Sequence, residues 1–224
     1  KRSDKGDFLI EKIIDSFSSE TTIVALIARL KSKRLKNKVL LNFSKNELIV
    51  DLYDRISNNS PFKVVLATSF LKEDDLLANL FEKKSFPVFR GDDISIIDRM
   101  LRLAFIEKAS SIFRVTGDNP FTDPYLMNEM SQMLNKHNLD YVRVNNAPFG
   151  VSAELFSTKY LWKLYLNLES TEYSEYLSWH VLNDKDVKMG SIDILTDKKT
   201  NINLSVDYEK DFQDCKKLLL KIDK

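Results

Sequence analysis

Three observations predict an α/β fold with a mixed, mostly parallel central sheet and helices on both faces. Short apolar runs of strand length alternate with amphipathic segments of helical period, an order that requires crossover helices between parallel strands. Only five of the 224 residues are glycine and five are proline, so hinges are few and one main domain is expected. Hydrophobic residues make up 43% of the chain and charged residues 30%, the usual balance of a domain that buries its own core.

Residues 1–20 are expected to be a lead-in helix and linker, and residues 21–224 the main domain. Apolar positions from Phe8 to Phe17 predict the helix, and the polar stretch 18–22 predicts the join. We expect this segment to be where an upstream domain of a fused polypeptide would be attached.

The main domain then alternates strands and helices. The apolar run 23–28 predicts a buried strand, and the helix after it carries Leu48, Ile49 and Leu52 on one face. A later helix has Pro124 in its first turn, where proline is well tolerated. The predicted strands are 23–28, 63–68, 86–89, 111–116, 141–144, 151–156, 188–195 and 202–206. The predicted helices are 47–56, 73–83, 93–108, 123–137, 158–168 and 208–222, and residues 170–185 fit neither pattern.

The overall charge and the scarcity of cysteine and histidine exclude several classes of protein. Lysine and arginine total 34 against 33 aspartate and glutamate, so a nucleic-acid coat is not expected. Cys215, His137 and His180 cannot form a disulfide or a four-cysteine zinc site, and one cysteine favours a reducing, cytoplasmic compartment. No apolar run reaches membrane-spanning length, so no membrane partner is expected.

Three catalytic motifs are also missing from the sequence. The chain contains no Gly-x-Ser-x-Gly, Gly-x-Gly-x-x-Gly or Walker A pattern. Their absence argues against a hydrolase with a serine nucleophile, a dinucleotide oxidoreductase and a P-loop enzyme. Covalent catalysis is not indicated.

A cationic loop and an acidic turn are the features that carry chemistry. Residues 29–38 contain six basic residues and follow the first strand, where phosphorylated ligands usually bind in α/β sheets. Asp118 follows the strand 111–116, where one carboxylate beside phosphate oxygens can hold Mg²⁺. Alone, the first feature is typical of a solvated basic loop and the second of a turn with a helix cap. Together they favour phosphoryl or nucleotidyl transfer.

Several blocks of the sequence resemble those of one enzyme family. Residues 28–40 (ARLKSKRLKNKVL) are similar to the A-R-x-x-S-x-R-L-P-x-K-x-L signature of the cytidylyltransferases that activate acylneuraminates and 3-deoxy-manno-octulosonate. Residues 114–124 (RVTGDNPFTDP) resemble the R-x-T-G-D-x-P-x-x-D-P block of that family. Further blocks follow in family order at 67–69, 88–92, 98–99, 148–150, 154, 180–181 and 205–207, the later ones resembling the spore-coat-polysaccharide branch.

The resemblance implies a Rossmann-like nucleotidyltransferase fold and Mg²⁺-dependent transfer of CMP from CTP to an acidic sugar or a phosphonate or phosphate acceptor. Pyrophosphate would be released, and the reaction would serve cell-surface polysaccharide biosynthesis. The implied nucleotide-binding residues are Ala28, Arg29, Ser32, Arg34, Lys38, Thr68, Arg90 and Gly91, and the implied catalytic residues are Arg29, Arg34, Lys38 and Asp118. The implied metal ligands are Asp118 and Asp207, and the implied acceptor-binding residues are Arg114, Glu154 and His180. A homodimer formed through residues 145–185, as in relatives, is a further expectation.

Some of these roles have an alternative, and the loop departs from the family pattern. Asp207 could equally be the N-cap of the last helix, and Arg114 could pair with a neighbouring carboxylate. Lys31, Lys36 and Asn37 stand where family loops usually carry Gly, Pro and Gly. These replacements change the backbone geometry open to the loop and raise its positive charge.

Two other functions remain open from the sequence. A nucleotide-sugar glycosyltransferase would want an Asp-x-Asp pair at the strand end, which residues 117–119 do not supply. A domain of the same fold that binds nucleotide or a partner without turnover is consistent with the altered loop. RNA binding is disfavoured, because residues 29–38 contain no aromatic side chain on which bases could stack.

Overall fold

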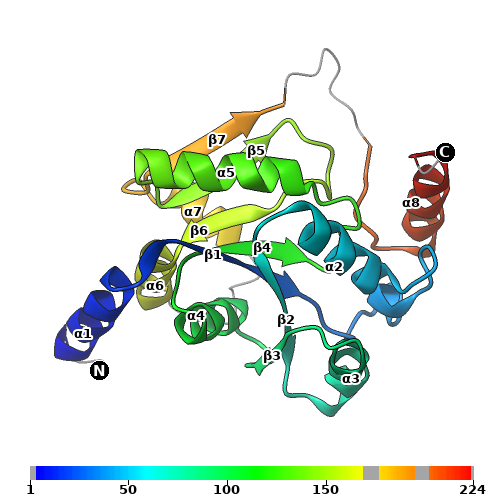
Figure 1. The fold of residues 1–224 in the computed structure, drawn as a ribbon, viewed down its shortest axis with the longest axis horizontal. Coiled ribbons are helices and arrows are strands. Elements are labelled where there is room, and N and C mark those ends of the chain that lie inside the picture. The colour runs from blue at the N-terminus through cyan, green and yellow to red at the C-terminus, as the bar shows by residue number, and fades with distance from the viewer. Residues whose placement is uncertain (1–3, 169–176, 195–201, 223–224) are drawn as a thin grey trace.

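The computed structural model describes residues 4–168, 177–194 and 202–222, and there the chain forms a seven-stranded sheet with helices on both faces (Figure 1). The strands are β1 (Ser18–Ile27), β2 (Lys63–Ser69), β3 (Val88–Gly91), β4 (Ala109–Thr116), β5 (Tyr141–Asn145), β6 (Glu154–Ser157) and β7 (Met189–Asp193), in the order β3-β2-β1-β4-β6-β5-β7 across the sheet. β6 runs antiparallel to β4 and β5, and the other neighbouring pairs are parallel. The predicted mixed, mostly parallel α/β fold is confirmed.

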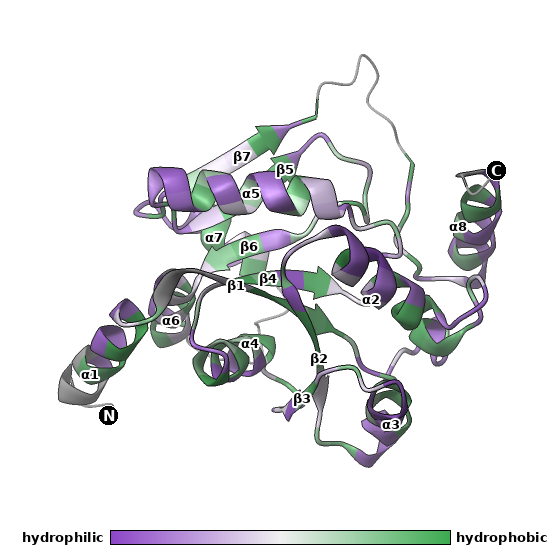
Figure 2. Cartoon of the chain, in the orientation of Figure 1, coloured by the Kyte–Doolittle hydropathy of each residue, from purple (hydrophilic) through white to green (hydrophobic). Residues whose placement is uncertain are grey.

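The helices form two layers. They are α1 (Asp4–Asp15), α2 (Leu48–Asn59), α3 (Asp75–Lys83), α4 (Ile96–Ile106), α5 (Pro124–His137), α6 (Thr158–Asn167), α7 (Leu177–Asn183) and α8 (Glu209–Ile222), with short 3-10 turns η1 (Lys38–Leu40) and η2 (Lys72–Asp74). Helices α4, α6 and α7 pack on one face, with α1 against α6, and α2, α3 and α5 pack on the other. Figure 2 shows hydrophilic and hydrophobic residues alternating around α5, whereas β4 is mainly hydrophobic. None of the described helices is long and apolar enough to cross a membrane.

β1 shows why the central strands are continuous apolar runs. Ile23, Ala25 and Ile27 belong to the core under α4 and α6, and Val24 and Leu26 to the core under α2 and α5. All five are at most 7% exposed. A parallel strand with helices on both faces needs apolar side chains at every position, and burying one large aliphatic side chain contributes about 2 kcal/mol.

Two predicted segments have a different structure. Residues 18–22, predicted as a linker, are the start of β1. Ser18 and Thr22 pair in parallel with β4, with a register shift between them, and Thr22 shares a 2.7 Å hydroxyl hydrogen bond with Ser111. Residues 202–206, predicted as a strand, make only an isolated bridge between Asn203 and Phe149. The boundary of the main domain after residue 20 stays a prediction.

Other predicted elements differ in their ends. The helix predicted from residue 93 begins at Ile96, because the Asp92 carboxylate accepts hydrogen bonds from the Ile94 and Ser95 amides and holds them in a turn. The short strand predicted at 86–89 lies at 88–91, and the one predicted at 151–156 lies at 154–157. Within the ambiguous stretch 170–185, residues 177–183 form α7, and residues 170–176 lie outside the described part of the chain.

The topology brings two loops and one returning segment to the same edge of the sheet. β1 and β4 are parallel neighbours, so the loop 28–40 and the turn 117–120 both leave at their carboxyl ends. Residues 202–207 then cross this edge, where the Leu204 amide donates to the Phe149 carbonyl at 2.7 Å and the Val206 amide to the Asp118 carbonyl at 2.8 Å. Gly150 permits this crossing, because at φ +92° its Cα lies so close that an added Cβ would be 2.5 Å from the Ser205 nitrogen.

Candidate active site

A cavity of about 600 Å³, called here the first cavity, opens at the carboxyl edge of β1 and β4. Six of the residues predicted to bind nucleotide or metal or to act in catalysis line it: Ala28, Arg29, Arg34, Lys38, Asp118 and Asp207. They come from the β1 loop, the β4 turn and the segment before α8. A cavity of this size is sufficient for a nucleotide.

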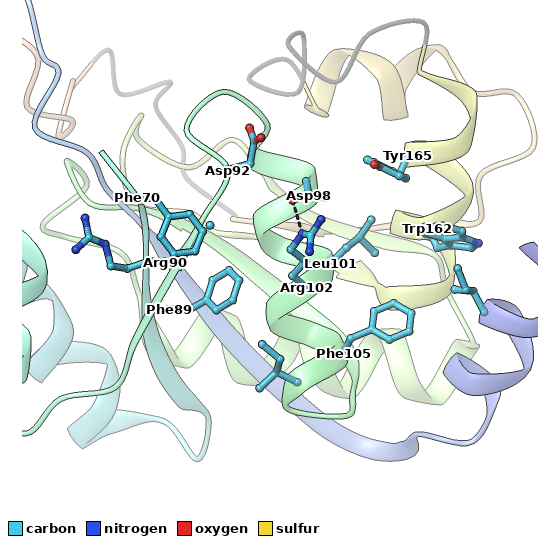
Figure 3. Close-up of a pocket in the computed structure, with 13 residues that line it drawn as sticks. Phe70, Phe89, Arg90, Asp92, Asp98, Leu101, Arg102, Phe105, Trp162 and Tyr165 are labelled. Atoms are coloured by element: carbon cyan, nitrogen blue, oxygen red, sulfur yellow. Dashed lines mark hydrogen bonds and ion pairs between the residues drawn. The ribbon is translucent and has the colours of Figure 1, made fainter. Parts of the chain in front are cut away.

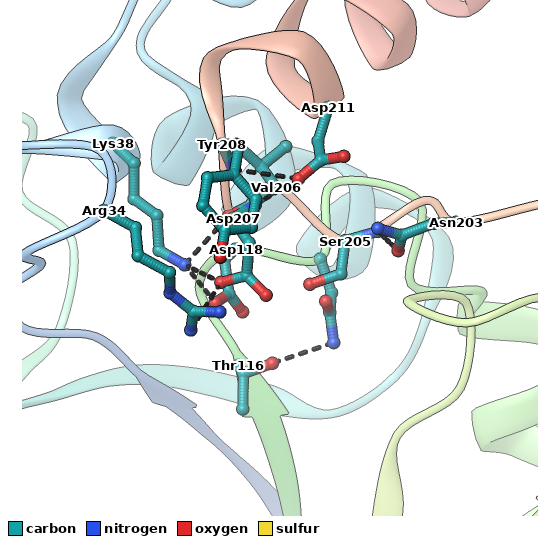
Figure 4. A network of polar contacts seen from close by, with 11 residues as sticks. Arg34, Lys38, Thr116, Asp118, Asn203, Ser205, Val206, Asp207, Tyr208 and Asp211 are labelled. Atoms are coloured by element: carbon teal, nitrogen blue, oxygen red, sulfur yellow. Dashed lines mark hydrogen bonds and ion pairs between the residues drawn. The ribbon is translucent and has the colours of Figure 1, made fainter.

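Two carboxylates in the first cavity meet at one ammonium group (Figure 4). The Lys38 Nζ donates to Asp118 Oδ2 at 2.6 Å, to Asp207 Oδ1 at 3.0 Å and to the Val206 carbonyl at 2.8 Å. Arg34 adds a second cation, with its Nη2 3.0 Å from Asp207 Oδ1. Asp118 and Asp207, which are 89 positions apart in the sequence, thus share one cationic partner.

Asp207 does not cap the last helix. The backbone amides of Asp207 and Tyr208 donate instead to the Asp211 carboxylate, at 3.1 and 2.8 Å. The Asp207 side chain is therefore turned away from α8 and toward Lys38, so the helix-cap alternative is wrong.

The oxygen atoms around the Lys38 ammonium fit a divalent metal ion. Asp118, Asp207 and the Val206 carbonyl supply only oxygen donors, which are the ligands that Mg²⁺ prefers. In the described ranges no group of three or more His, Cys, Asp and Glu side chains converges as a metal site. Two carboxylates suit Mg²⁺, because this ion keeps several waters and takes further ligands from a phosphorylated substrate.

The loop that carries the cations is anchored by Asp74, a residue that sequence reasoning missed. The Asp74 side chain is fully buried, accepts a 2.7 Å hydrogen bond from the Leu30 amide and accepts another from the Ser69 hydroxyl. A buried, hydrogen-bonded carboxylate fixes the point where the loop leaves β1. The only signal in the sequence was its place in an acidic stretch that also fits a helix start.

Asn37 explains how the loop tolerates one departure from the family pattern. Its backbone has φ 53° and ψ 30°, a left-handed conformation, at the start of η1. Asparagine enters this conformation more easily than other residues that carry a Cβ. The loop therefore turns into η1, and Lys38 reaches the first cavity, without the usual glycine.

Arg99 is a further cation of the first cavity that was not assigned a role from the sequence. Its side chain is fully buried on α4, and its Nη1 donates to the Ala67 carbonyl at 3.2 Å. Its Nε and Nη2 atoms have no hydrogen-bond partner among the described residues. Burial, and then the charge of Arg29, lower the pKa of Arg99 to about 10, so the side chain stays charged at neutral pH. Its place in the block 98–99 was the available signal.

Four of the predicted nucleotide-binding residues do not line the first cavity. Thr68 is fully buried within β2, and Ser32 lies on the loop away from the cavity lining. Arg90 donates to the carbonyls of Ser69 and Leu71 at 2.8 and 3.0 Å and pairs with Asp75, so it ties β3 to the start of α3. Arg90 and Gly91 line a separate apolar groove between β3, α4 and α6 (Figure 3).

A second cavity, of about 390 Å³, adjoins the first and shares Arg114, Thr116, Asn119 and Phe149 with it. Within it, Arg114 forms an ion pair with Glu154, as the alternative interpretation of Arg114 predicted. Glu154 also accepts 2.6 Å hydrogen bonds from the Tyr141 hydroxyl and the Ser178 hydroxyl. The structure thus brings two of the predicted acceptor residues together.

Glu154 is ionised despite its burial. Burial alone raises the pKa of this carboxyl, but the charge of Arg114 and hydrogen bonds from Ser178, Tyr141 and Arg114 outweigh it and leave the pKa below its ordinary value. His180, the third predicted acceptor residue, lies on α7 outside the lining of this cavity, with its ring edge-on to Trp179.

The sequence profile of the cytidylyltransferases matches residues 23–222 of this chain. The chain belongs to the cytidylyltransferase family. It is therefore a nucleotidyltransferase, as the sequence blocks predicted. The spore coat polysaccharide biosynthesis protein SpsF of Bacillus subtilis is 33% identical over 162 residues, which cover 70% of this chain and 68% of that protein.

Solved structures have the same fold. A cytidylyltransferase from Leptospira borgpetersenii superposes with a TM-score of 0.82 at 23% identity, over 90% of this chain and 87% of the other. A CMP:2-keto-3-deoxy-manno-octonic acid synthetase complexed with CTP superposes with a TM-score of 0.71 at 15% identity, over 91% of this chain and 100% of the other. At these identities the likeness establishes the nucleotidyltransferase fold of this cytidylyltransferase.

Proposed function

We propose that this cytidylyltransferase uses CTP and Mg²⁺ to transfer CMP to an acidic acceptor, with release of pyrophosphate. The observation that carries the proposal is the convergence of Asp118 and Asp207 on the Lys38 ammonium in the first cavity. Paired carboxylates beside several cations suit a metal-bound triphosphate at this edge of a parallel sheet. The CTP in the structural neighbour supports the choice of nucleotide.

In the proposed reaction, an acceptor oxygen attacks the α-phosphorus of CTP in line. A new phosphorus–oxygen bond forms, the bond to the oxygen that bridges the α- and β-phosphates breaks, pyrophosphate leaves, and the acceptor proton passes to solvent. Arg29, Arg34 and Lys38 line the cavity and would stabilise the charge that develops on the phosphate oxygens. Asp118 and Asp207 would hold Mg²⁺, which supplies charge neutralisation and orients the phosphates.

The second cavity is the proposed place of the acceptor, which would be an acidic sugar or a phosphonate or phosphate. It adjoins the first cavity at Arg114 and Asn119, so a ligand there would lie next to Asp118. The name of the SpsF relative supports a place in cell-surface polysaccharide biosynthesis. The roles of Ser32, Thr68 and Arg90 toward the nucleoside, and a dimer through residues 145–185, stay predictions.

The test is pyrophosphate release from CTP with Mg²⁺ and a panel of acidic acceptors. Asp118→Ala should abolish release and should weaken Mn²⁺ binding measured by calorimetry. Asp214→Ala, on the exposed face of α8, is the matched control and should behave as wild type. Undiminished turnover in Asp118→Ala would rule out the metal assignment.

The same panel separates the alternative functions. CTP binding without pyrophosphate release from any acceptor would favour a non-catalytic nucleotide-binding domain. Turnover of a nucleotide sugar in place of CTP would favour a glycosyltransferase.

A further inference from the structure

The second cavity contains two cations and one carboxylate, and their charges are not evenly matched. Arg114, Arg143 and Glu154 line it together with uncharged residues. Arg114 and Glu154 form a largely buried ion pair, with side chains 15% and 17% exposed. Because the pKa of Glu154 lies below its ordinary value, the pair is ionised at neutral pH and its charges cancel. The net charge of the cavity is therefore that of Arg143.

Within the described part of the chain, Arg143 has no carboxylate partner to balance its charge. Its Nε atom is buried without a hydrogen-bond partner, and among the described residues no carboxylate forms an ion pair with it. Burying an unpaired charged donor is unfavourable, and a ligand that supplies an anionic oxygen removes this cost. The sequence did not single out Arg143, because it lies in an otherwise ordinary strand.

The backbone around Arg143 holds it firmly in place. It lies in β5, opposite Ser191 of the parallel neighbour β7. Tyr141, two positions earlier, points to the same side of the strand, and its hydroxyl is bound to Glu154. A guanidinium mounted on a paired strand is better preorganised for an anion than one on a loop.

Asn119 supplies a second unsatisfied group, and it lies between the two cavities. It lines both of them and directly follows Asp118 in the chain. Its Nδ2 donates to the Thr116 hydroxyl at 2.8 Å, whereas its Oδ1 is buried with no hydrogen-bond partner in the described ranges. An acceptor hydroxyl that donates to this oxygen would stand beside the proposed metal site.

We propose that Arg143 is the anion subsite for the acceptor: it binds the single carboxylate, phosphonate or phosphate group of a ligand whose reacting hydroxyl lies at Asn119. The identification of this ligand as the acceptor rests on the proposed function. The assignment differs from the sequence-based one, which gave the acceptor contact to Arg114. Arg114 instead neutralises Glu154, and Arg143 remains available for the ligand.

The test is calorimetry on the full chain saturated with Mg²⁺ and α,β-methylene-CTP, which prevents turnover. The probes are N-acetylneuraminate, 3-deoxy-manno-octulosonate and methylphosphonate, with N-acetylneuraminate methyl ester as the uncharged match. At least one acid should bind to wild type, and Arg143→Gln should weaken it about tenfold or more. Arg143→Lys, which keeps the positive charge, should lose less affinity for the acid than Arg143→Gln. Both variants should bind the nucleotide as wild type does, and Arg102→Gln, an exposed arginine on α4, should change nothing.

Three results would overturn the subsite: equal binding of the acids by Arg143→Gln and wild type, equal binding of the ester and its acid, or no binding of any acid by wild type. A loss of nucleotide affinity in Arg143→Gln, or a fall in its melting temperature matched by Arg143→Lys, would also count against it. Pyrophosphate release is measured separately. Acid binding that depends on Arg143 without any release would contradict the proposed function and leave the subsite standing.

Discussion

The two cavities are built in different ways from the same sheet. The first lies between the parallel strands β1 and β4, and one continuous loop, residues 28–40, supplies three of its cations, Arg29, Arg34 and Lys38. The second lies where β6 turns the sheet antiparallel, and its charged groups come from three strands, with Arg114 on β4, Arg143 on β5 and Glu154 on β6. A loop can be identified from sequence alone, whereas a set of residues on separate strands can be identified only once the strands are placed.

The cavities also differ in how their charges are satisfied. In the first, Lys38 and Arg34 balance Asp118 and Asp207, an arrangement that a metal and a triphosphate can replace. In the second, Arg114 and Glu154 are held together by several hydrogen bonds and stay as they are. The first cavity is thus expected to rearrange on binding and the second to be preformed.

The strongest test of this contrast is Lys38→Met. Loss of one cation that stabilises the transition state should lower pyrophosphate release by about 10²–10³-fold. Mn²⁺ binding without nucleotide should become tighter, because the ammonium no longer competes for Asp118 and Asp207. Both are measured on the same preparation, by a coupled pyrophosphate assay and by calorimetry.

Lys36→Met, an exposed neighbour on the loop, is the control and should change neither quantity much. Unchanged Mn²⁺ affinity in Lys38→Met would contradict the view that the ammonium occupies the metal position.

The next largest effect is expected for Glu154→Gln, which should lower the stability of the folded protein. It removes the carboxylate charge that Arg114 faces in a largely buried place, and breaking such an ion pair costs about 3 kcal/mol. The folded-state pKa of Glu154 lies below its ordinary value of 4.5, so its contribution is fully present above that value and is lost as pH falls through the folded pKa. The difference in the free energy of unfolding between wild type and Glu154→Gln, measured by urea unfolding, should therefore shrink as pH falls below 4.5.

The matched control is Glu107→Gln, which removes the ion pair with the half-exposed Lys63 and should cost less than about 1 kcal/mol. If the loss of unfolding free energy in Glu154→Gln stays constant from neutral to acid pH, the charge of Glu154 is not what stabilises the second cavity.

The smallest effect is expected at Asn37. Asn37→Val forces a β-branched residue into the left-handed conformation at φ 53°, which should cost about 1–2 kcal/mol and weaken CTP binding. Asn37→Gly should be tolerated. Asn138→Val, at φ 48° after α5, is the control and should lose similar stability without changing CTP affinity. Equal CTP affinity of the two valine variants would show that the turn at Asn37 does not contribute to nucleotide binding.

Much of the fold could be predicted because its signals are local. The apolar strands β1, β2 and β4, the amphipathic helices between them and Pro124 at the first turn of α5 all lie where the sequence predicts them. Two of the errors fall where strand pairing decides the structure. Residues 18–22 are polar, yet they extend β1 because β4 is beside them, and residues 202–206 read as a strand but have only one bridge partner.

The alternating α/β order, the family and the group of cations after the first strand can be predicted from the sequence, because each is encoded within a short stretch of chain. The contacts of those cations depend on the folded arrangement. It brought Asp207 to Asp118, directed the Asp207 amide to the Asp211 carboxylate, paired Arg114 with Glu154 and left the Arg143 Nε without a partner among the described residues. These outcomes depend on distances between residues far apart in the chain, and such distances are set by strand order and packing, which no short stretch of sequence contains.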